Sequence, residues 1–368
     1  MSETKSGKKS KRIFYFDALR ALAICSVLIF HVSHDCGLLI LDQYKLFNWN
    51  WILTDVGYTF FCCGVDIFLM LSGALSLGRV WDIKSFLGRR IPRIVAPFLF
   101  WGFVLSVFAV AVSFYYPKMF TTINPYNITN FLGYLGKTYA AKSFGFTPYW
   151  FFWMILGTYL IMPIFNKWLY NADLKEAEYF LVIWAVTCLF TETLKISFPI
   201  KLTYFAGPIG MVVLGYYLRH TDRKIFNNIY VSIFLVLFSL VSFVLLSHAN
   251  SSPDMMAKFS RYHILMVIEV IGLFTLFKNI SQLNLNIKFF SNDKGIFRKS
   301  IYSIAKYSYG IYLIHRLVPI LLLKIVTPMN IAYKPLYFGM IIATIAISWL
   351  IMAVFNRIPF VNRVIGAK

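Results

Sequence analysis

The chain has few charged residues and very few acidic ones. Only 14% of its 368 residues are Asp, Glu, Lys or Arg, and 15 are acidic. Soluble proteins are about 25% charged and about 45–50% apolar. Here 59% of the residues are hydrophobic, and they recur in apolar runs of about 20 residues, long enough to cross a bilayer. The composition excludes an ordinary soluble protein and predicts a polytopic membrane protein.

Signatures of several other protein classes are also missing. The five cysteines give no disulfide framework. No HxxxH or CxxC pair has the spacing of metal ligands, and we expect no metal site. Without GxxxxGK[ST], strand-linked GxGxxG or Gly-x-Ser-x-Gly, neither a common nucleotide fold nor a nucleophile elbow is indicated. No internal repeat is visible, which disfavours the repeat-built transporters.

The hydrophobic runs predict an all-α fold, because lipid cannot satisfy an open backbone. We expect a polytopic membrane helical bundle of about ten transmembrane helices. The candidate spans are 13–36, 56–78, 95–115, 149–166, 179–194, 203–218, 226–247, 263–277, 305–325 and 335–356.

The net charge of +21 is interpreted mainly as membrane topology. Lys and Arg gather in alternate loops on the side that holds the N-terminus, which places both termini in the cytoplasm. The expected organisation is a basic tail over 1–12, a transmembrane domain over 13–357 and a second cytoplasmic tail over 358–368. We expect a multi-pass protein of the plasma or inner cell membrane, with membrane lipid as a partner and no nucleic acid.

Polar residues interrupt the first span, in DALRALAICSVLIFH. A charged side chain at the bilayer centre costs about 3 kcal/mol on insertion scales. Arg20 and His31 are eleven residues apart, so they share one helix face about 16 Å apart along the axis. Asp17 precedes Arg20 by three residues, a spacing that allows an ion pair. The alternatives are an interfacial pair with Arg20 snorkelling to the surface and a hydrogen-bonded core histidine.

The second span contains a buried acid in GVDIFLMLSG. Asp66 either pairs with a basic group on another helix or orients a histidine and shapes a cavity. Gly64, Ser72 and Gly73 are small enough for close helix approach.

Three arginines, Arg89, Arg90 and Arg93, cluster just before the third span in RRIPR. Pro92 lies among them, near the expected helix start, where proline is favoured. Arginines and helix N-termini both suit phosphate. The alternative is positive-inside charge alone.

The late segment YSYGIYLIHR places Ser308, Tyr312 and His315 on one helix face. Arg316 follows directly, at membrane depth, which favours a functional interpretation over aromatic packing around one hydrogen-bonded histidine.

These four motifs, in this order, resemble the acyltransferase-3 family of integral membrane acyltransferases. The family's first helix carries an arginine, ten residues and a histidine, as in Arg20 to His31. GVDIFLMLSG resembles its second helix, Arg90 and Arg93 match its arginine pair before the third, and SYGIYLIH matches its near-terminal stretch. The middle of the chain, about 115–300, matches only in hydrophobicity. The chain would be a standalone member of the O-antigen or surface-polysaccharide O-acetylase type, without a fused hydrolase-like domain.

The resemblance implies an acyl-CoA donor, usually acetyl-CoA, in the cytoplasm and a hydroxyl acceptor on a surface glycan or glycolipid. It implies catalytic roles for His31, Arg20 and Asp66. Donor binding would fall to Arg89, Arg90 and Arg93, and cavity lining to Asp17, Ser72, Ser308, Tyr312 and His315. Transfer could be direct or pass through an acyl-histidine. A secondary transporter or exporter, and succinyl rather than acetyl transfer, remain open alternatives.

Overall fold

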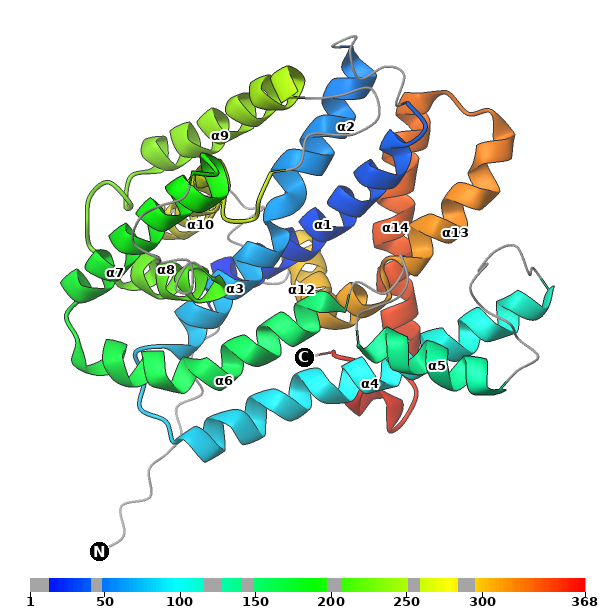
Figure 1. Ribbon diagram of the computed structural model, residues 1–368, viewed down its shortest axis with the longest axis horizontal. Coiled ribbons are helices and arrows are strands. Elements are labelled where there is room, and N and C mark those ends of the chain that lie inside the picture. Colours follow the sequence, from blue (N-terminus) through cyan, green and yellow to red (C-terminus); the bar gives the residue numbers. More distant parts are fainter. Residues whose placement is uncertain are drawn as a thin grey trace, which may run out of the picture.

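The computed structural model describes residues 13–40, 48–115, 128–140, 149–196, 207–250, 259–283 and 295–367. Every regular element in these ranges is a helix, and none is a strand (Figure 1). The prediction of an all-α polytopic bundle is therefore confirmed.

The helices run in chain order as follows: α1 (Phe14–Gly37), α2 (Trp49–Thr59), η2 (Phe60–Cys63), α3 (Gly64–Ser76), α4 (Ile83–Tyr115), α5 (Ile128–Tyr139), α6 (Trp150–Asn171), α7 (Leu174–Thr187), η3 (Cys188–Thr193), α8 (Pro208–His220), α9 (Ile229–Asn250), α10 (Ile264–Gln282), α12 (Ile296–Ile314), α13 (Leu317–Val326), η5 (Thr327–Met329), α14 (Tyr333–Phe355) and η6 (Val361–Arg363).

The described helices give fewer candidate membrane spans than the apolar runs predicted. Six of the described helices are long and apolar enough to cross a membrane, or seven if the bent α12–α13 pair is one span. The ten predicted spans are not reached because α7 and α8 have only 14 and 13 residues. Helix α6 has 22 residues but is not among the six.

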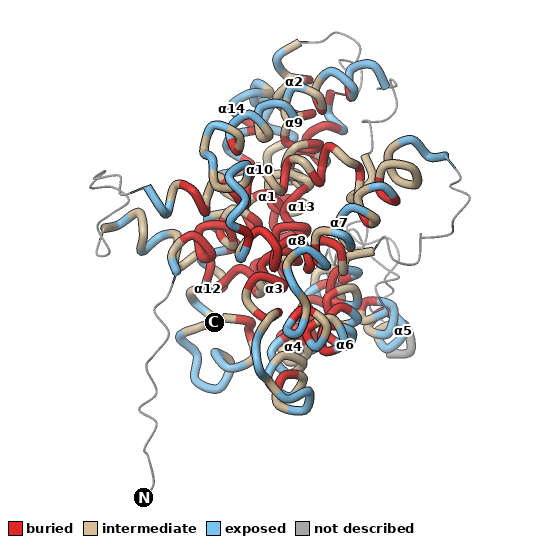
Figure 2. Tube along the Cα trace, turned by 90° about the vertical axis from the view of Figure 1, so that its left-hand side faces the viewer, coloured by how far each residue is buried: buried red, intermediate tan, exposed pale blue. Residues whose placement is uncertain are grey.

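The central helices are buried, whereas α9 and α14 lie at the periphery. In the apolar stretches of α1 and of α2 through α3, 67% of the residues are buried, against 17% in α9 and 22% in α14. Figure 2 shows this contrast between a buried centre and an exposed rim. The exposed side chains of α9 and α14 include many large apolar residues, as expected of helices that face lipid.

Small residues bring α1, α3 and α8 close together. A Cβ at Gly73 would overlap the Val212 backbone, and one at Gly215 would overlap the Met70 backbone. Gly64 likewise meets the Ala23 carbonyl of α1. The predicted packing role of Gly64 and Gly73 is confirmed, and it holds together three of the helices that line the site.

Helix α4 begins earlier than predicted, at Ile83 rather than near residue 95. Asp82 explains this start, because its side chain accepts a hydrogen bond from the Ser85 backbone N–H at 3.0 Å, as an N-cap does. Pro92 therefore lies inside the helix and not in its first turn. Arg89, Arg90 and Arg93 consequently project from a helix instead of a loop.

The predicted span 305–325 is not one straight helix. Helices α12 and α13 meet at an angle of 72°, and the break falls at His315 and Arg316. Two polar residues thus occupy the corner of a bent pair.

The two ends of the described chain meet at one face of the bundle. Ile13 and Gly366 line the same cavity. The segment expected to be a tail after residue 357 folds back, with Ile365 fully buried and its carbonyl accepting from the Trp101 indole N–H at 3.1 Å.

Candidate active site

A cavity of about 620 Å³ lies between the central helices, and cations dominate its polar lining. Helices α1, α3, α4, α6, α8 and α12 all contribute to it. Among the described residues that line it, the basic side chains are Arg20, Arg79, Arg90, Arg93, Arg219 and Lys306, and the one carboxylate is Asp17. Such an excess of positive charge suits an anionic ligand.

The Asp17–Arg20 pair expected from the sequence is present. Arg20 donates from Nη1 to Asp17 Oδ1 at 3.2 Å. Asp17 is buried, whereas the Arg20 side chain is 31% exposed. Arg20 therefore keeps access to the cavity while its position is fixed by its own helix.

Three further arginines converge on the cavity mouth. Arg90 donates to Ser76 Oγ at 2.8 Å, which ties α4 to the end of α3. Arg219, from the last turn of α8, donates to the Ala74 carbonyl. Burial, together with repulsion from the Arg219 and Arg90 guanidinium groups, lowers the pKa of Arg79 below its usual range. This mutual repulsion would be relieved by a bound anion.

Arg89 is placed differently from its two neighbours. It is exposed, and its Nε donates to the Ser85 carbonyl one turn earlier in α4 at 3.0 Å. It does not line the cavity, unlike Arg90 and Arg93. The three arginines expected in one anion site are therefore divided into two that reach the cavity and one that does not.

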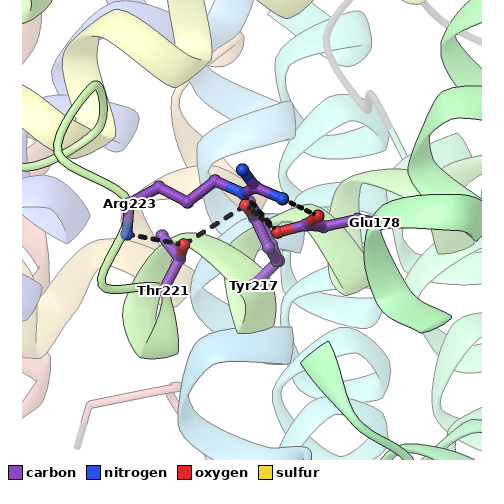
Figure 3. Close-up of polar contacts among 4 residues, drawn as sticks. All are labelled: Glu178, Tyr217, Thr221 and Arg223. Atoms are coloured by element: carbon purple, nitrogen blue, oxygen red, sulfur yellow. Dashed lines mark hydrogen bonds and ion pairs between the residues drawn. The ribbon is translucent and has the colours of Figure 1, made fainter. Parts of the chain in front are cut away.

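Arg223, in contrast, is an arginine whose charge is paired with an acid, Glu178 (Figure 3). Its Nε donates to Glu178 Oε1 at 2.6 Å, and the Tyr217 hydroxyl donates to the same oxygen at 2.7 Å. These hydrogen bonds lower the pKa of Glu178 to about 2. No comparable acid faces Arg79 or Arg90 among the described residues that line the cavity.

The inner end of the cavity is apolar and aromatic. Phe68, Leu71, Phe151, Ile155 and Tyr312 line it. The rings of Phe151 and Tyr312 meet edge to face, with centroids 4.9 Å apart. Ser72 and Ser308 also line the cavity, as the sequence predicted, and Ser72 donates to the Phe68 carbonyl of its own helix at 2.9 Å.

Behind this aromatic end lie two histidines from opposite ends of the sequence. The His31 and His315 ring centroids are 4.9 Å apart, and the Tyr312 ring is 5.5 Å from His315. Neither histidine lines the cavity. The sequence could align Arg20 with His31 on one helix, but it could not show that His31 faces His315.

The bend next to His315 is held by a buried ion pair. Arg316 donates to Asp35 Oδ2 at 2.6 Å, and His34 Nδ1 lies 3.1 Å from Asp35 Oδ1. Because α1 supplies Asp35 and the corner of α12–α13 supplies Arg316, the pair fixes the two histidine-bearing elements against each other.

Asp66 does not make either contact proposed from the sequence. It is fully buried, and neither of its carboxylate oxygens has a hydrogen-bond partner in the described part of the chain. Arg261 acts electrostatically on both Asp66 and His31, and its guanidinium lies 3.8 Å from the centroid of the Trp150 ring. Asp66 thus belongs to the histidine side of the site without orienting His31 directly.

Sequence reasoning missed four basic residues of this region: Arg79, Arg219, Arg261 and Lys306. Arg79, Arg219 and Lys306 fall in segments whose charge was interpreted as membrane topology. The sequence did contain a signal for Arg219. It lies in the last turn of α8, near the small residues that let α8 pack closely on α3. Arg261 had no sequence signal. Within the described ranges, no three His, Cys, Asp or Glu side chains form a metal-binding group.

Comparison with known proteins agrees with these motifs. The model of the acyltransferase-3 family, described as an acyltransferase domain, matches residues 13–353. The match includes all four sequence motifs, both histidines and every basic residue of the cavity. No curated protein and no solved structure matches the chain. A match over this much of the chain shows that the protein belongs to the acyltransferase-3 family and is a multi-pass membrane acyltransferase.

Proposed function

We propose that this protein transfers an acetyl group from cytoplasmic acetyl-CoA to a hydroxyl of a cell-surface glycan or glycolipid, in the plasma or inner membrane. The observation that carries the proposal is the cavity, where six cations surround one carboxylate and the apolar end points toward a pair of histidines.

The donor half of the proposal rests on charge and size. Coenzyme A carries several phosphate charges, and guanidinium groups bind phosphate through paired, charge-assisted hydrogen bonds. Arg79, Arg90 and Arg93 supply such groups at the cavity mouth. The volume of about 620 Å³ lies within the range of small-molecule sites. The cavity also borders both described chain ends, which the charge pattern assigns to the cytoplasm.

The acyl half rests on the aromatic end of the cavity. The packed rings of Phe151 and Tyr312 line the cavity together with Ser72 and Ser308, and we infer that this bulk favours a short acyl group over a long one. To react, the thioester must pass these rings and reach His31.

His31 is the group best placed to perform the chemistry. It either takes the proton of the acceptor hydroxyl or attacks the thioester itself. In both routes the C–S bond breaks, a C–O bond to the acceptor forms, and the hydroxyl proton ends on the coenzyme A sulfur. Arg20 lies about 16 Å along α1 from His31, so it serves the bound donor and not the oxyanion formed at His31.

The test is a transfer assay with radiolabelled acetyl-CoA in membranes. The variants Arg90→Ala and Arg93→Ala, singly and combined, are compared with Arg89→Ala, which removes one positive charge from the same helix outside the cavity. We expect label in lipid-linked or surface glycan with wild type and Arg89→Ala, and a strong loss with the double variant at low acetyl-CoA.

The outcomes separate the alternatives. Transfer that is equal in all these proteins would contradict the donor site while leaving the enzyme class intact. Folded wild-type protein that neither binds nor consumes acetyl-CoA would contradict the proposal and favour an exporter. Better use of succinyl-CoA than acetyl-CoA would correct the acyl group alone.

A further inference from the structure

His315 has one ring nitrogen with a partner and one without. Its Nδ1 lies 2.7 Å from the Tyr312 carbonyl oxygen. A carbonyl oxygen only accepts, so Nδ1 carries the hydrogen and Nε2 of the neutral ring holds a lone pair. His315 is fully buried, and Nε2 has no hydrogen-bond partner in the described residues. A buried polar atom without a partner is rare enough to call for an explanation.

The ring of His31 lies next to the ring of His315. The two centroids are 4.9 Å apart with an interplanar angle of 43°. His31 lies on α1 and His315 at the 72° corner between α12 and α13. The helices thus bring together two imidazoles, of which one has a fixed tautomer and a free basic nitrogen.

The charged side chains near the pair include the guanidinium groups of Arg261 and Arg316 and the carboxylate of Asp35. His31 is surrounded by His34, His315, Arg261 and Arg316. His315 is surrounded by Arg316, Asp35 and the Tyr312 carbonyl. The guanidinium of Arg316 is paired with Asp35, so one positive and one negative charge adjoin His315.

We propose that His315 is the proton-accepting partner of His31 during acyl transfer, an inference that rests on the proposed function. His31 takes the hydroxyl proton on one nitrogen and passes the proton of its other nitrogen to His315 Nε2. When the C–S bond breaks, His315 returns that proton to His31, and His31 delivers one to the thiolate sulfur. One O–H bond is lost and one S–H bond is gained, so protons balance. His315 acts through His31 and is a positioning and proton-holding residue.

Three variants test this role. His315→Asn keeps a donor near the Nδ1 position but removes the basic nitrogen. His315→Ala leaves a space that added imidazole can enter. His220→Asn is the matched control, since His220 Nδ1 lies 2.9 Å from the Tyr216 carbonyl in the same local arrangement, on α8 and outside the cavity. Melting temperature and binding of coenzyme A establish that each variant is folded.

We expect His315→Asn to lower kcat about 10²-fold without raising the KM for acetyl-CoA. The wild-type pH–rate profile should contain two coupled ionisation steps, and the variant only one. Imidazole should restore His315→Ala at least tenfold and leave His31→Ala inactive. His220→Asn should match wild type.

Failure of this inference differs from failure of the proposed function. Wild-type transfer together with a His315→Asn rate within threefold of it would overturn the role of His315 alone. So would a loss of rate that leaves the pH profile unchanged and resists imidazole, because that pattern belongs to packing. Folded wild-type protein with no acyl transfer would overturn both.

Discussion

The basic cavity and the histidine pair are neighbours with opposite chemistry. The described lining of the cavity includes six basic side chains, whereas the His31–His315 pair lies next to Arg316, whose charge is paired with Asp35. Tyr312 belongs to both, since it lines the cavity and its ring lies 5.5 Å from His315. The difference indicates that one layer of aromatic rings separates the groups that bind the donor from those that react with it.

His31→Ala tests this separation with the largest expected effect. Without the imidazole the acceptor hydroxyl has no base and the thioester no nucleophile, so transfer should fall by about 10²–10⁴-fold. Because His31 does not line the cavity, coenzyme A should still bind and stabilise the variant against heat as in wild type. Labelled transfer and thermal unfolding with and without coenzyme A measure the two properties. A variant that transfers acetyl normally would refute the assignment of His31.

Arg79→Gln tests the other side of the comparison. Burial and, to a smaller extent, repulsion from Arg219 and Arg90 lower the pKa of Arg79, and a bound phosphate would relieve the repulsion. A charge-assisted hydrogen bond contributes about 1.5–3 kcal/mol, so the KM for acetyl-CoA should rise at least about tenfold while kcat stays near wild type. Steady-state kinetics at two salt concentrations measure this, and the salt dependence should weaken in the variant.

The control for Arg79→Gln is Arg89→Gln, which removes a cation outside the cavity. A fall in kcat with unchanged KM in Arg79→Gln would mean that the cavity takes part in the chemical step, and the two regions could no longer be treated as separate.

Phe151→Ala probes the aromatic layer itself. Phe151 is buried and packs edge to face on Tyr312 at the apolar end of the cavity. Removing its ring should admit longer acyl groups and raise the preference for butyryl-CoA over acetyl-CoA by about tenfold, the scale on which a pocket discriminates one or two methylenes. Competition between the two donors measures the ratio. Ile164→Ala, exposed on the same helix, should leave it unchanged.

Hydrophobic runs and local spacing predicted much of this architecture. The helical class, the Asp17–Arg20 pair and the close approach at Gly64 and Gly73 all depend on residues near one another in sequence, or on one helix surface. The start of α4 was missed because the apolar run begins after the helix does, although Asp82 carried a capping signal.

The parts of the site that could not be predicted are those that join distant segments. His31 meets His315 across 284 positions, and Asp35 meets Arg316 across 281. The periodicity of a sequence does not predict such a pairing. Arg79 and Arg219 were also missed, because their charge was attributed to membrane topology like that of the other loop cations. The bend at His315 was not predicted either, because the hydrophobic run continues through it.

The smallest predicted effect concerns Arg223, the paired arginine that contrasts with those of the cavity. Its hydrogen bonds lower the pKa of Glu178 to about 2, against about 4.3 in an unfolded chain. A carboxyl whose pKa is lower in the folded state stabilises the protein above about pH 4.3, and this contribution is lost as the pH falls toward 2. The pair is exposed, so salt should weaken it and Glu178→Gln should lower the melting temperature at pH 7 by only about 1 °C. The difference between wild type and variant should vanish at acidic pH.

The control is Glu176→Gln, two residues earlier in α7, where the carboxylate accepts a hydrogen bond from the Trp168 indole. A difference that persists unchanged at pH 3 would show that packing, and not the charge of Glu178, holds α7 to the loop after α8.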